Sequence, residues 1–329
     1  MRDVHLKLFL TSVILLLTSI TAAQATAKDL PPVKVFLLAG QSNMQGQGVV
    51  DLDHPKYYNG GRGILERVMK DPAKAAKFKH LKDSAGKWVE RDDVLVWYKT
   101  KNGLKKGPLT IGFTGYGGNH HIGPELQFGH IVGDRLDAPV LLVKTAWGGK
   151  SLFKDFRPPS AGGETGPYYK QMFAELNHVL KNLGEEFPAL KGRRYEIAGF
   201  VWMQGWNDMF DKDALAQYEA NLVHLIHDVR KALDRPKLPV VIGELGNGGP
   251  KASGNMLAIR KAQAAAAAHK EFAGTVKFVK TARFARLAKD SPNTGHGHHW
   301  FGNAESYFLI GDALGRAVLE LLDPERSEP

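Results

Sequence analysis

The residues best suited to chemistry lie in the segment Gly40–Met44, which reads Gly-Gln-Ser-Asn-Met and directly follows the apolar run 35–39. Such a run is typical of a buried parallel strand, and residues just beyond its carboxyl end face the crevice where open α/β sheets bind ligands. We therefore predict that Ser42 is a nucleophile and that Gln41 and Asn43 orient a substrate. The alternative is an ordinary helix N-cap, where Ser and Asn are also favoured.

Two later segments also follow apolar runs. Residues 146–152 read Ala-Trp-Gly-Gly-Lys-Ser-Leu, and residues 202–208 read Trp-Met-Gln-Gly-Trp-Asn-Asp. Together with the segment 37–46 and a histidine-containing stretch before the last helix, they resemble the sequence blocks of the sialate O-acetylesterase-like branch of the SGNH hydrolases, which includes carbohydrate esterase family 6. The resemblance implies an exported esterase that removes acetyl groups from an acetylated carbohydrate through an acetyl-serine intermediate, without a cofactor.

Ester hydrolysis by a serine requires hydrogen-bond donors aimed at the developing oxyanion. The N–H of Ser42 is a natural first donor because the turn directs it toward the same pocket. The pair Gly148 and Gly149 can approach a ligand closely because it lacks side chains. The resemblance favours one of these two N–H groups as the second donor, with Gly149 preferred, and the side-chain amide of Gln204 as the third.

The base must be a histidine, because only imidazole titrates near neutral pH without special tuning. The resemblance places it in the stretch 295–303, just before the final helix, where His299 fits best and His298 is the runner-up. The family usually has an Asp three residues before the base, and this chain has His296 there. Either a backbone carbonyl orients the ring, in a dyad, or a carboxylate from elsewhere does. The open candidates are Asp290, Glu244 and Asp208.

Other residues near these segments have two interpretations each. Glu125 matches a Gly-Pro-Glu element of the family and is predicted to be a binding residue, or it complements a helix dipole. Trp147, Trp206 and Trp300 can stack on sugar rings or belong to the core. A metal centre is the alternative for the histidines, but no His-Glu-x-x-His segment occurs, so no metal is predicted. The histidines concerned are His120, His121, His296, His298 and His299.

Apolar runs predict five strands, at 33–39, 139–145, 197–203, 238–243 and 275–280. Helical patterns are predicted at 124–136, 168–183, 213–233, 255–269 and 303–322. Strands that alternate with amphipathic helices imply right-handed crossovers and a parallel sheet covered on both faces. The predicted fold class is therefore α/β, a three-layer α/β/α sandwich with a five-stranded parallel sheet, which the resemblance makes a flavodoxin-like SGNH hydrolase.

The stretch 49–119 is too long and polar for a single crossover helix. It is predicted to be an insertion that forms a cap. The turn signal Asn102-Gly103 between two apolar runs predicts a β-hairpin within it, near the mouth of the site.

The amino-terminal residues have the pattern of a secretory signal peptide, predicted to span 1–25, with the mature domain as 26–329. Its apolar stretch, 8–20, is too short to span a membrane comfortably, so the expected location is periplasmic or extracellular. Retention as an uncleaved anchor is the minority alternative.

The chain of 329 residues contains 0 Cys, which excludes disulfide and thiol chemistry. Its formal net charge of +10 comes without a Lys/Arg run interleaved with aromatic residues, so no nucleic-acid partner is predicted. The oligomeric state is not predicted. A lipase or peptidase would need an acyl or peptide groove that nothing in the sequence indicates. A non-catalytic glycan-binding protein on the same fold stays open, because fold does not guarantee function.

Overall fold

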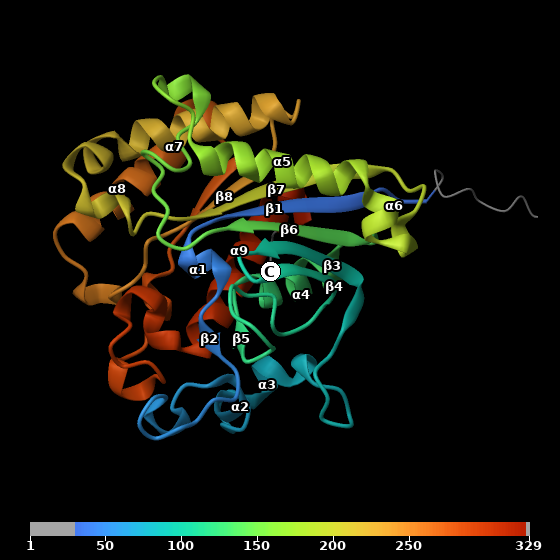
Figure 1. Cartoon of the computed structure of the whole chain (residues 1–329), viewed down its shortest axis with the longest axis vertical. Coiled ribbons are helices and arrows are strands. Elements are labelled where there is room, and N and C mark those ends of the chain that lie inside the picture. Colours follow the sequence, from blue (N-terminus) through green and yellow to red (C-terminus); the bar gives the residue numbers. More distant parts are fainter. Residues whose placement is uncertain (1–29, 327–329) are drawn as a thin grey trace, which may run out of the picture.

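The computed structural model describes residues 30–326, and the predicted signal peptide lies outside that range. A seven-stranded sheet forms its centre, with the order β4-β3-β6-β1-β7-β8-β9 (Figure 1). Neighbouring strands are parallel except for the antiparallel pair β3 and β4. The strands are β1 (Val33–Gly40), β3 (Arg91–Thr100), β4 (Gly103–Leu109), β6 (Val140–Ala146), β7 (Tyr195–Met203), β8 (Val240–Gly243) and β9 (Val276–Val279). A small second sheet pairs β2 (Gly48–Val49) with β5 (His121–Ile122).

Helices cover both faces of the large sheet. The helices α5 (Pro167–Lys181), α7 (Lys212–Ala232) and α8 (Asn255–Ala267) pack on one face, and α4 (Glu125–Arg135) and α9 (Ala304–Leu322) pack on the other (Figure 1). Four short helices complete the set: α1 (Ser42–Gln45), α2 (Leu65–Val68), α3 (Ala75–Phe78) and α6 (Leu183–Glu186). The predicted three-layer architecture is confirmed.

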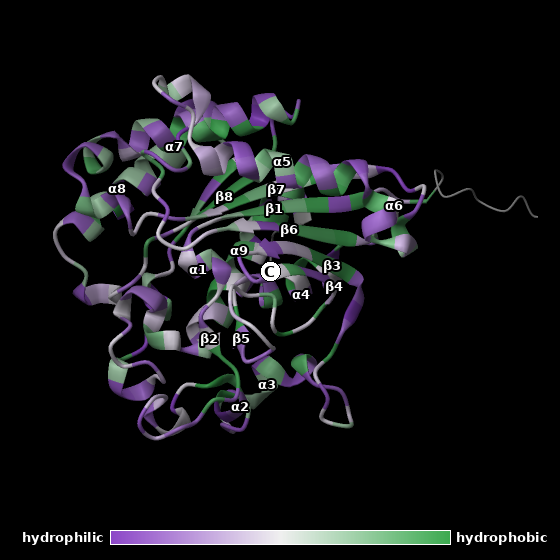
Figure 2. Ribbon diagram, viewed as in Figure 1, coloured by the Kyte–Doolittle hydropathy of each residue, from purple (hydrophilic) through white to green (hydrophobic). Residues whose placement is uncertain are grey.

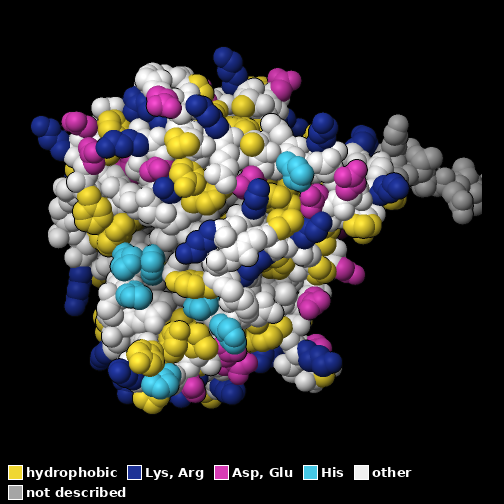
Figure 3. Space-filling model, in the orientation of Figure 1, with side chains coloured by type: hydrophobic (Ala, Val, Ile, Leu, Met, Phe, Trp, Pro, Cys, Tyr) yellow, Lys and Arg dark blue, Asp and Glu magenta, His cyan; other side chains and the backbone are white. Residues whose placement is uncertain are grey.

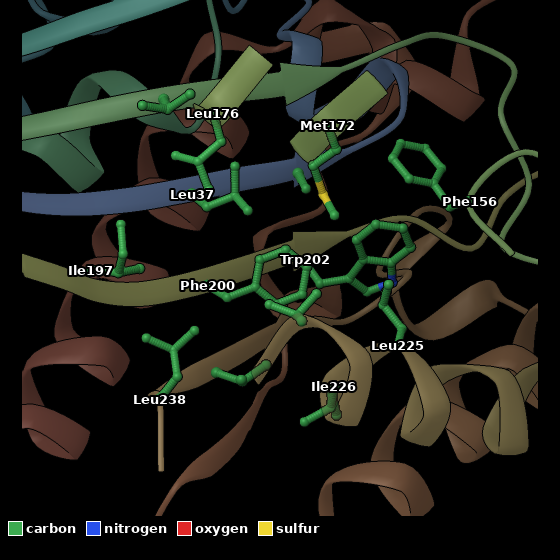
Figure 4. Packing of buried hydrophobic residues seen from close by; sticks show 14 of the residues in the cluster. Leu37, Phe156, Met172, Leu176, Ile197, Phe200, Trp202, Leu225, Ile226 and Leu238 are labelled. Carbon is green, nitrogen blue, oxygen red and sulfur yellow. The ribbon is translucent and has the colours of Figure 1, made fainter. Parts of the chain in front are cut away.

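Alternate residues of each central strand enter opposite cores, which is why these strands are apolar along their whole length (Figure 2). In β1, Leu37 faces the core under α5 and α7, whereas Phe36 and Leu38 face the core over α4 and α9. In the first core Trp202 packs among aliphatic side chains of α7 (Figure 4). Burial on both faces leaves only the strand ends for polar chemistry.

The predicted turn at Asn102-Gly103 joins β3 to β4, but the second strand is Gly103–Leu109 and not the apolar run 109–114 that was expected to pair with 93–98. The hairpin extends the main sheet and is not part of a separate cap. The strand β3 pairs with β6 in parallel. Its side chains are apolar on both faces, because Val94 and Val96 enter one core and Leu95 and Trp97 enter the other. A strand of that kind must be covered on both sides, which an exposed cap does not allow.

The turn after β1 depends on a glycine. Gly40 has a φ of 154°, and a Cβ at this position would lie only 2.1 Å from the carbonyl oxygen of Met203. That same carbonyl accepts a hydrogen bond from the N–H of Gln41, at 3.2 Å. The close approach of the two strand ends sends the chain directly into α1, whose first residue is Ser42.

A buried ion pair joins the turn to the layer beneath it. Lys144 has no exposed side-chain surface, and its ammonium group donates to Glu125 Oε2 at 2.6 Å. It also donates to the carbonyl oxygens of Gln45 and Phe113, at 3.0 and 2.7 Å. The three hydrogens of the ammonium group therefore match three acceptors. Burial lowers the pKa of Lys144, which the nearby Glu125 carboxylate partly offsets.

We expect Gly40→Ala to lower the free energy of unfolding by at least about 2 kcal/mol, because the added methyl group collides with a carbonyl that cannot move away. Gly107→Ala is the control: Gly107 has a φ of 148°, but a Cβ there meets open space. Urea denaturation measures the free energy of unfolding of both variants. Both share the cost of a positive φ, so a larger loss in Gly40→Ala reports the collision. Equal losses in both would show that the collision is not the cause.

We expect Lys144→Met to cost about 3–5 kcal/mol, because it leaves a buried carboxylate unpaired. The double variant with Glu125→Leu should recover much of that loss, since the unpaired charge is gone. Lys106→Met removes an ion pair with Glu186 whose lysine is 38% exposed, and should cost about 0–1 kcal/mol. Calorimetric or urea unfolding checks the ranking, and a Lys144 loss as small as the Lys106 loss would contradict it.

Candidate active site

Ser42 lies at the carboxyl edge of the sheet, beside the segment that follows β6. A Cβ built at Gly148 would be 3.7 Å from the Cβ of Ser42, so these two predicted segments meet. Within residues 30–326, the backbone N–H groups of Ser42, Gly148 and Gly149 donate no hydrogen bond. Gly149 has a φ of 72°, and a side chain there would meet open space. These N–H groups can therefore bind an anionic ligand.

Gln41 links the three segments that follow β1, β6 and β7. Its Nε2 donates to Asn207 Oδ1 at 3.1 Å, and its Oε1 accepts from the N–H of Gly205 at 3.2 Å. Asn207 Nδ2 in turn donates to the carbonyl oxygen of Gly149, at 3.0 Å. Gln41 was predicted to orient a substrate, and in the structure both ends of its amide are occupied by the protein.

Gln204 lies at the end of β7 with its side-chain amide fully engaged. The Nε2 donates to the carbonyl oxygen of Lys150 at 3.0 Å and to Asp208 Oδ2 at 2.5 Å. The Oε1 accepts from the hydroxyl of Tyr218, at 3.0 Å. To donate to an oxyanion, as the resemblance implies, Gln204 has to exchange one of these acceptors for the ligand.

Asp208 is fully buried and fixes the turn that follows β7. It accepts hydrogen bonds from the N–H groups of Leu152 and Phe153, both at 2.9 Å, in addition to the amide of Gln204. Burial raises the pKa of Asp208 to about 6, although these hydrogen bonds oppose the rise. Both oxygens are thus used to hold the backbone, away from the histidine loop.

A polar network ties residues 295–303, the histidine loop, to residues 40–44, which we call the nucleophile turn after the role predicted for Ser42. Asn43 Nδ2 donates to the carbonyl oxygen of His298, at 3.0 Å. Asn247 Nδ2 donates to the same carbonyl, also at 3.0 Å. The hydroxyl of Tyr307 donates to Asn43 Oδ1 at 2.7 Å and lies 3.2 Å from the carbonyl oxygen of His299. The residues that adjoin Ser42 and His299 are therefore held together.

His299 is a partly buried imidazole beside two other imidazoles. Its ring centroid is 4.0 Å from that of His298 and 6.3 Å from that of His296. Burial, followed by repulsion from these two neighbours, lowers the pKa of His299 to about 4. Burial also lowers the pKa of His298. The sequence analysis predicts a base whose pKa lies near neutral pH. In the structure the pKa of His299 is lower than that prediction.

No carboxylate orients this ring among residues 30–326. There, no Asp or Glu oxygen lies within 4.0 Å of a ring nitrogen of His298 or His299. Glu244 instead accepts from the N–H of Ala282, at 2.7 Å. The three predicted carboxylates, Asp290, Glu244 and Asp208, are not hydrogen-bonded to His299. Within the same range Ser42 Oγ and the His299 ring form no direct hydrogen bond, so the hydrogen bond predicted between nucleophile and base is not present in this structure.

The chain turns sharply just after His299 through a pair of unfavourable conformations. Trp300 and Phe301 have φ values of 53° and 55°, in the left-handed region that bulky residues avoid. The N–H of Phe301 donates to the carbonyl oxygen of His296, at 3.0 Å, which closes the turn. Trp300 is 2% exposed and its Nε1 is buried without a partner in the structure, so Trp300 belongs to the core and not to a sugar platform.

A cavity of about 490 Å³ opens beside the nucleophile turn. Gln45, the last residue of α1, and Gly148 form the wall nearest to Ser42. The other walls combine aromatic rings with cationic and amide side chains. They include Trp147, Tyr168, Tyr116, Lys101, Lys150 and Asn102. Figure 3 shows histidine, lysine or arginine, and hydrophobic side chains close together on the same face of the molecule.

One wall of this cavity is a glycine-rich loop held by Lys105. The Lys105 ammonium donates to the carbonyl oxygens of Gly112 and Tyr116, at 2.6 and 2.5 Å. Burial lowers the pKa of Lys105. The Tyr116 ring stacks on His121 with centroids 4.1 Å apart, and its hydroxyl is bonded to Gln47. The wall is therefore fixed at both its backbone and its aromatic ring.

The remaining predicted residues fall into two groups. Glu125 is 1% exposed and bound by Lys144, so it supports the site from beneath and does not line the cavity. Trp206 is half-buried and packs against the core under α5 and α7, and its ring lies beside His298, with ring centroids 5.7 Å apart. Within residues 30–326, no three His, Asp or Glu side chains form a group that could hold a metal ion. In that range, no helix has the length and apolar character needed to cross a membrane.

Four residues with structural roles in the site were not predicted: Lys144, Asn207, Asn247 and Tyr307. A signal was available for Lys144, because a lysine within the apolar run 140–146 requires a buried partner. Tyr307 lies one helical turn into α9 and has no motif of its own. The partners of Asn207 and Asn247 come from distant segments, so only three-dimensional coordinates identify them.

The chain is similar to known proteins in sequence and in fold. Residues 32–320 match the family described as "Carbohydrate esterase, sialic acid-specific acetylesterase". A probable carbohydrate esterase of Arabidopsis thaliana is 26% identical over 224 residues, which cover 67% of this chain and 72% of the relative.

Three solved structures share the fold, each at 20% identity or less. The X-ray structure of the corresponding Arabidopsis thaliana protein is 20% identical with a TM-score of 0.56, over 88% of this chain and 99% of that one. A carbohydrate acetylesterase from Xanthomonas citri is 14% identical with a TM-score of 0.52, over 89% and 57%. The structure of NanS is also 14% identical with a TM-score of 0.50, over 89% and 98%.

The family match covers nearly all of the described chain, and it confirms the resemblance that the sequence segments indicate. Ester hydrolysis on carbohydrates follows from membership. The chain belongs to the carbohydrate esterase family of sialic acid-specific acetylesterases.

Proposed function

We propose that this carbohydrate esterase is a serine O-acetylesterase that removes acetyl groups from sugar hydroxyls. Ser42 Oγ attacks the acetyl carbonyl carbon while His299 takes the hydroxyl proton. The tetrahedral intermediate collapses as His299 returns that proton to the sugar oxygen, which leaves as a hydroxyl. Water then attacks the acetyl-serine, His299 accepts and returns its proton, and acetate is released.

The observation that carries this proposal is the buried network on Asn43. It joins the residue after Ser42 to the backbone of the two candidate bases, His298 and His299, across more than 250 residues of chain. A serine that only capped a helix would not require hydrogen bonds between the next residue and the histidine loop. The proximity of Gly148 to Ser42 supports the same interpretation, because it brings unpaired N–H groups to the serine.

The oxyanion is proposed to bind the N–H groups of Ser42 and Gly149, with Gln204 as the third donor. Preorganised donors of this kind stabilise the transition state because they need little reorganisation during the reaction. Asp208 supports Gln204 by holding one hydrogen of its amide, at 2.5 Å. The other hydrogen, now on the carbonyl oxygen of Lys150, is the one available for exchange.

The acetylated sugar is proposed to occupy the 490 Å³ cavity, because Gln45 and Gly148 bring its wall to the serine. Trp147 and Tyr168 offer ring faces there, with centroids 5.1 Å apart. Export is part of the proposal and rests on the composition of residues 1–25.

The second candidate is a glycan-binding protein without turnover. It is favoured by the fact that no carboxylate lies beside His299 among residues 30–326. A carboxylate normally stabilises the imidazolium that forms during catalysis. We expect a dyad to work with reduced rate, so measurable acetate release separates the two functions.

We expect Ser42→Ala to lower kcat/KM for 4-nitrophenyl acetate by more than about 1,000-fold, because the nucleophile is lost. The matched control is Ser160→Ala. The hydroxyl oxygen of Ser160 lies 2.8 Å from His224 Nδ1 at an exposed position. This serine–histidine pair on the surface could release acetate nonspecifically. Acetate release that survives Ser42→Ala but falls with Ser160→Ala would overturn the assignment.

We expect kcat/KM to be constant around neutral pH and to fall as the pH drops through about 4. The base must be neutral to accept a proton, and the buried His299 becomes protonated only near that pH. A stopped assay of acetate release from pH 3 to 8 measures the profile. An acid limb centred near 6.5 would contradict a buried base.

The variant His298→Gln tests the choice of base in the same assay. Removing the neighbouring imidazole should raise the pKa of His299 and move the acid limb to higher pH, with activity retained. Complete loss of activity would make His298 the base.

A further inference from the structure

The most exposed large hydrophobic side chain among residues 30–326 lies next to the candidate site. Phe210 is 71% exposed. Its ring centroid is 5.9 Å from that of Trp206, whose ring is 5.7 Å from that of His298. The ring of His298 is in turn 4.0 Å from that of His299. A continuous series of rings therefore leads from the solvent to the candidate base.

The backbone turn that carries this exposed ring is anchored by a buried carboxylate. Phe210 ends the short 3-10 turn Asp208–Phe210, which begins at a fully buried carboxylate. Asp208 is bonded to the N–H groups of Leu152 and Phe153 and to the amide of Gln204. A single exposed apolar ring is common, but this one lies against the half-buried ring of Trp206, and contiguous apolar surface beside a site is typical of ligand contact.

We propose that Phe210 and Trp206 form a subsite for a neighbouring sugar ring, so that the substrate is an acetylated oligosaccharide of two or more units. The inference rests on the proposed function. The acetylated unit would occupy the 490 Å³ cavity on the Gly148 side of Ser42, and the next pyranose would lie against Phe210 on the His298 side. Ring C–H faces of a pyranose are flat and apolar, which suits a flat aromatic surface.

The local shape favours a sugar ring over an acyl chain. The cavity that Trp206 borders has a volume of only about 10 Å³, which is too small to enclose an acyl chain. An acyl chain needs such a groove, because it must be covered on several sides to leave water. A pyranose needs cover on one face only, since its hydroxyl groups stay in solvent.

The test compares substrates of two lengths on the same enzyme. Two substrate pairs are used, each with one short and one long member. The first pair is O-acetylated methyl xyloside and O-acetylated xylotetraose, and the second is O-acetylated sialic acid and O-acetylated sialyllactose. In the pair that the wild type hydrolyses faster, we expect the oligosaccharide to have the higher kcat/KM. Phe210→Ala should reduce that preference about 3- to 10-fold, mainly through KM for the oligosaccharide. Phe210→Trp should retain it.

The matched control is Tyr195→Ala. Tyr195 is 46% exposed but starts β7, at the opposite end of the sheet from the candidate site, so its loss should leave the preference unchanged. A wild type without length preference, or a Phe210→Ala variant that keeps it, would overturn the subsite. So would glycan inactivity in an enzyme that cleaves 4-nitrophenyl acetate. Failure of the wild type on 4-nitrophenyl acetate as well would contradict the proposed function itself.

Discussion

Everything at the candidate site depends on the hydrogen bond from Asn43 to the carbonyl oxygen of His298. Asn43 follows Ser42 directly, and its amide is saturated by the loop and by Tyr307. Because the Asn43 side chain is buried, breaking this hydrogen bond would leave its amide without a full set of partners, which costs more free energy than at an exposed position. The protein thus holds its histidine loop by the backbone, where related hydrolases commonly orient the ring with a carboxylate.

A second set of contacts fixes the other side of the turn. Lys144 joins the end of α1 to the loop at Phe113 through a single buried ammonium. Gln41 joins the turn to the segment after β7, because its Oε1 accepts a hydrogen bond from the N–H of Gly205. Polar groups with all partners satisfied rigidify a core, and here they do so directly beneath a cavity. The nucleophile turn is therefore constrained from three directions before any ligand arrives.

The sequence was sufficient to predict the layers, the strands β1, β6, β7, β8 and β9 and the segments that follow them. Burial on both faces leaves a continuous apolar pattern in the inner strands, although the edge strand β9 is only half-buried. The sequence was not sufficient to place β3, whose apolar residues were assigned to a cap although they complete both cores. Contacts of Asn247 and Tyr307 depend on side chains meeting across distant segments, which local patterns do not encode. The lowered pKa of His299 could not be predicted either, since it arises from burial that only the folded chain provides.

The paired left-handed residues Trp300 and Phe301 have an evolutionary consequence. Each such conformation costs on the order of 1–3 kcal/mol, so replacement of the half-buried Phe301 by Gly or Asn would relieve strain and raise thermal tolerance. Trp300 offers no such gain, because its removal would leave a cavity in the core. Replacement of Phe301 would also loosen the bend that carries the proposed base, so natural variation at this position should be limited by selection for turnover, at the expense of a more robust fold.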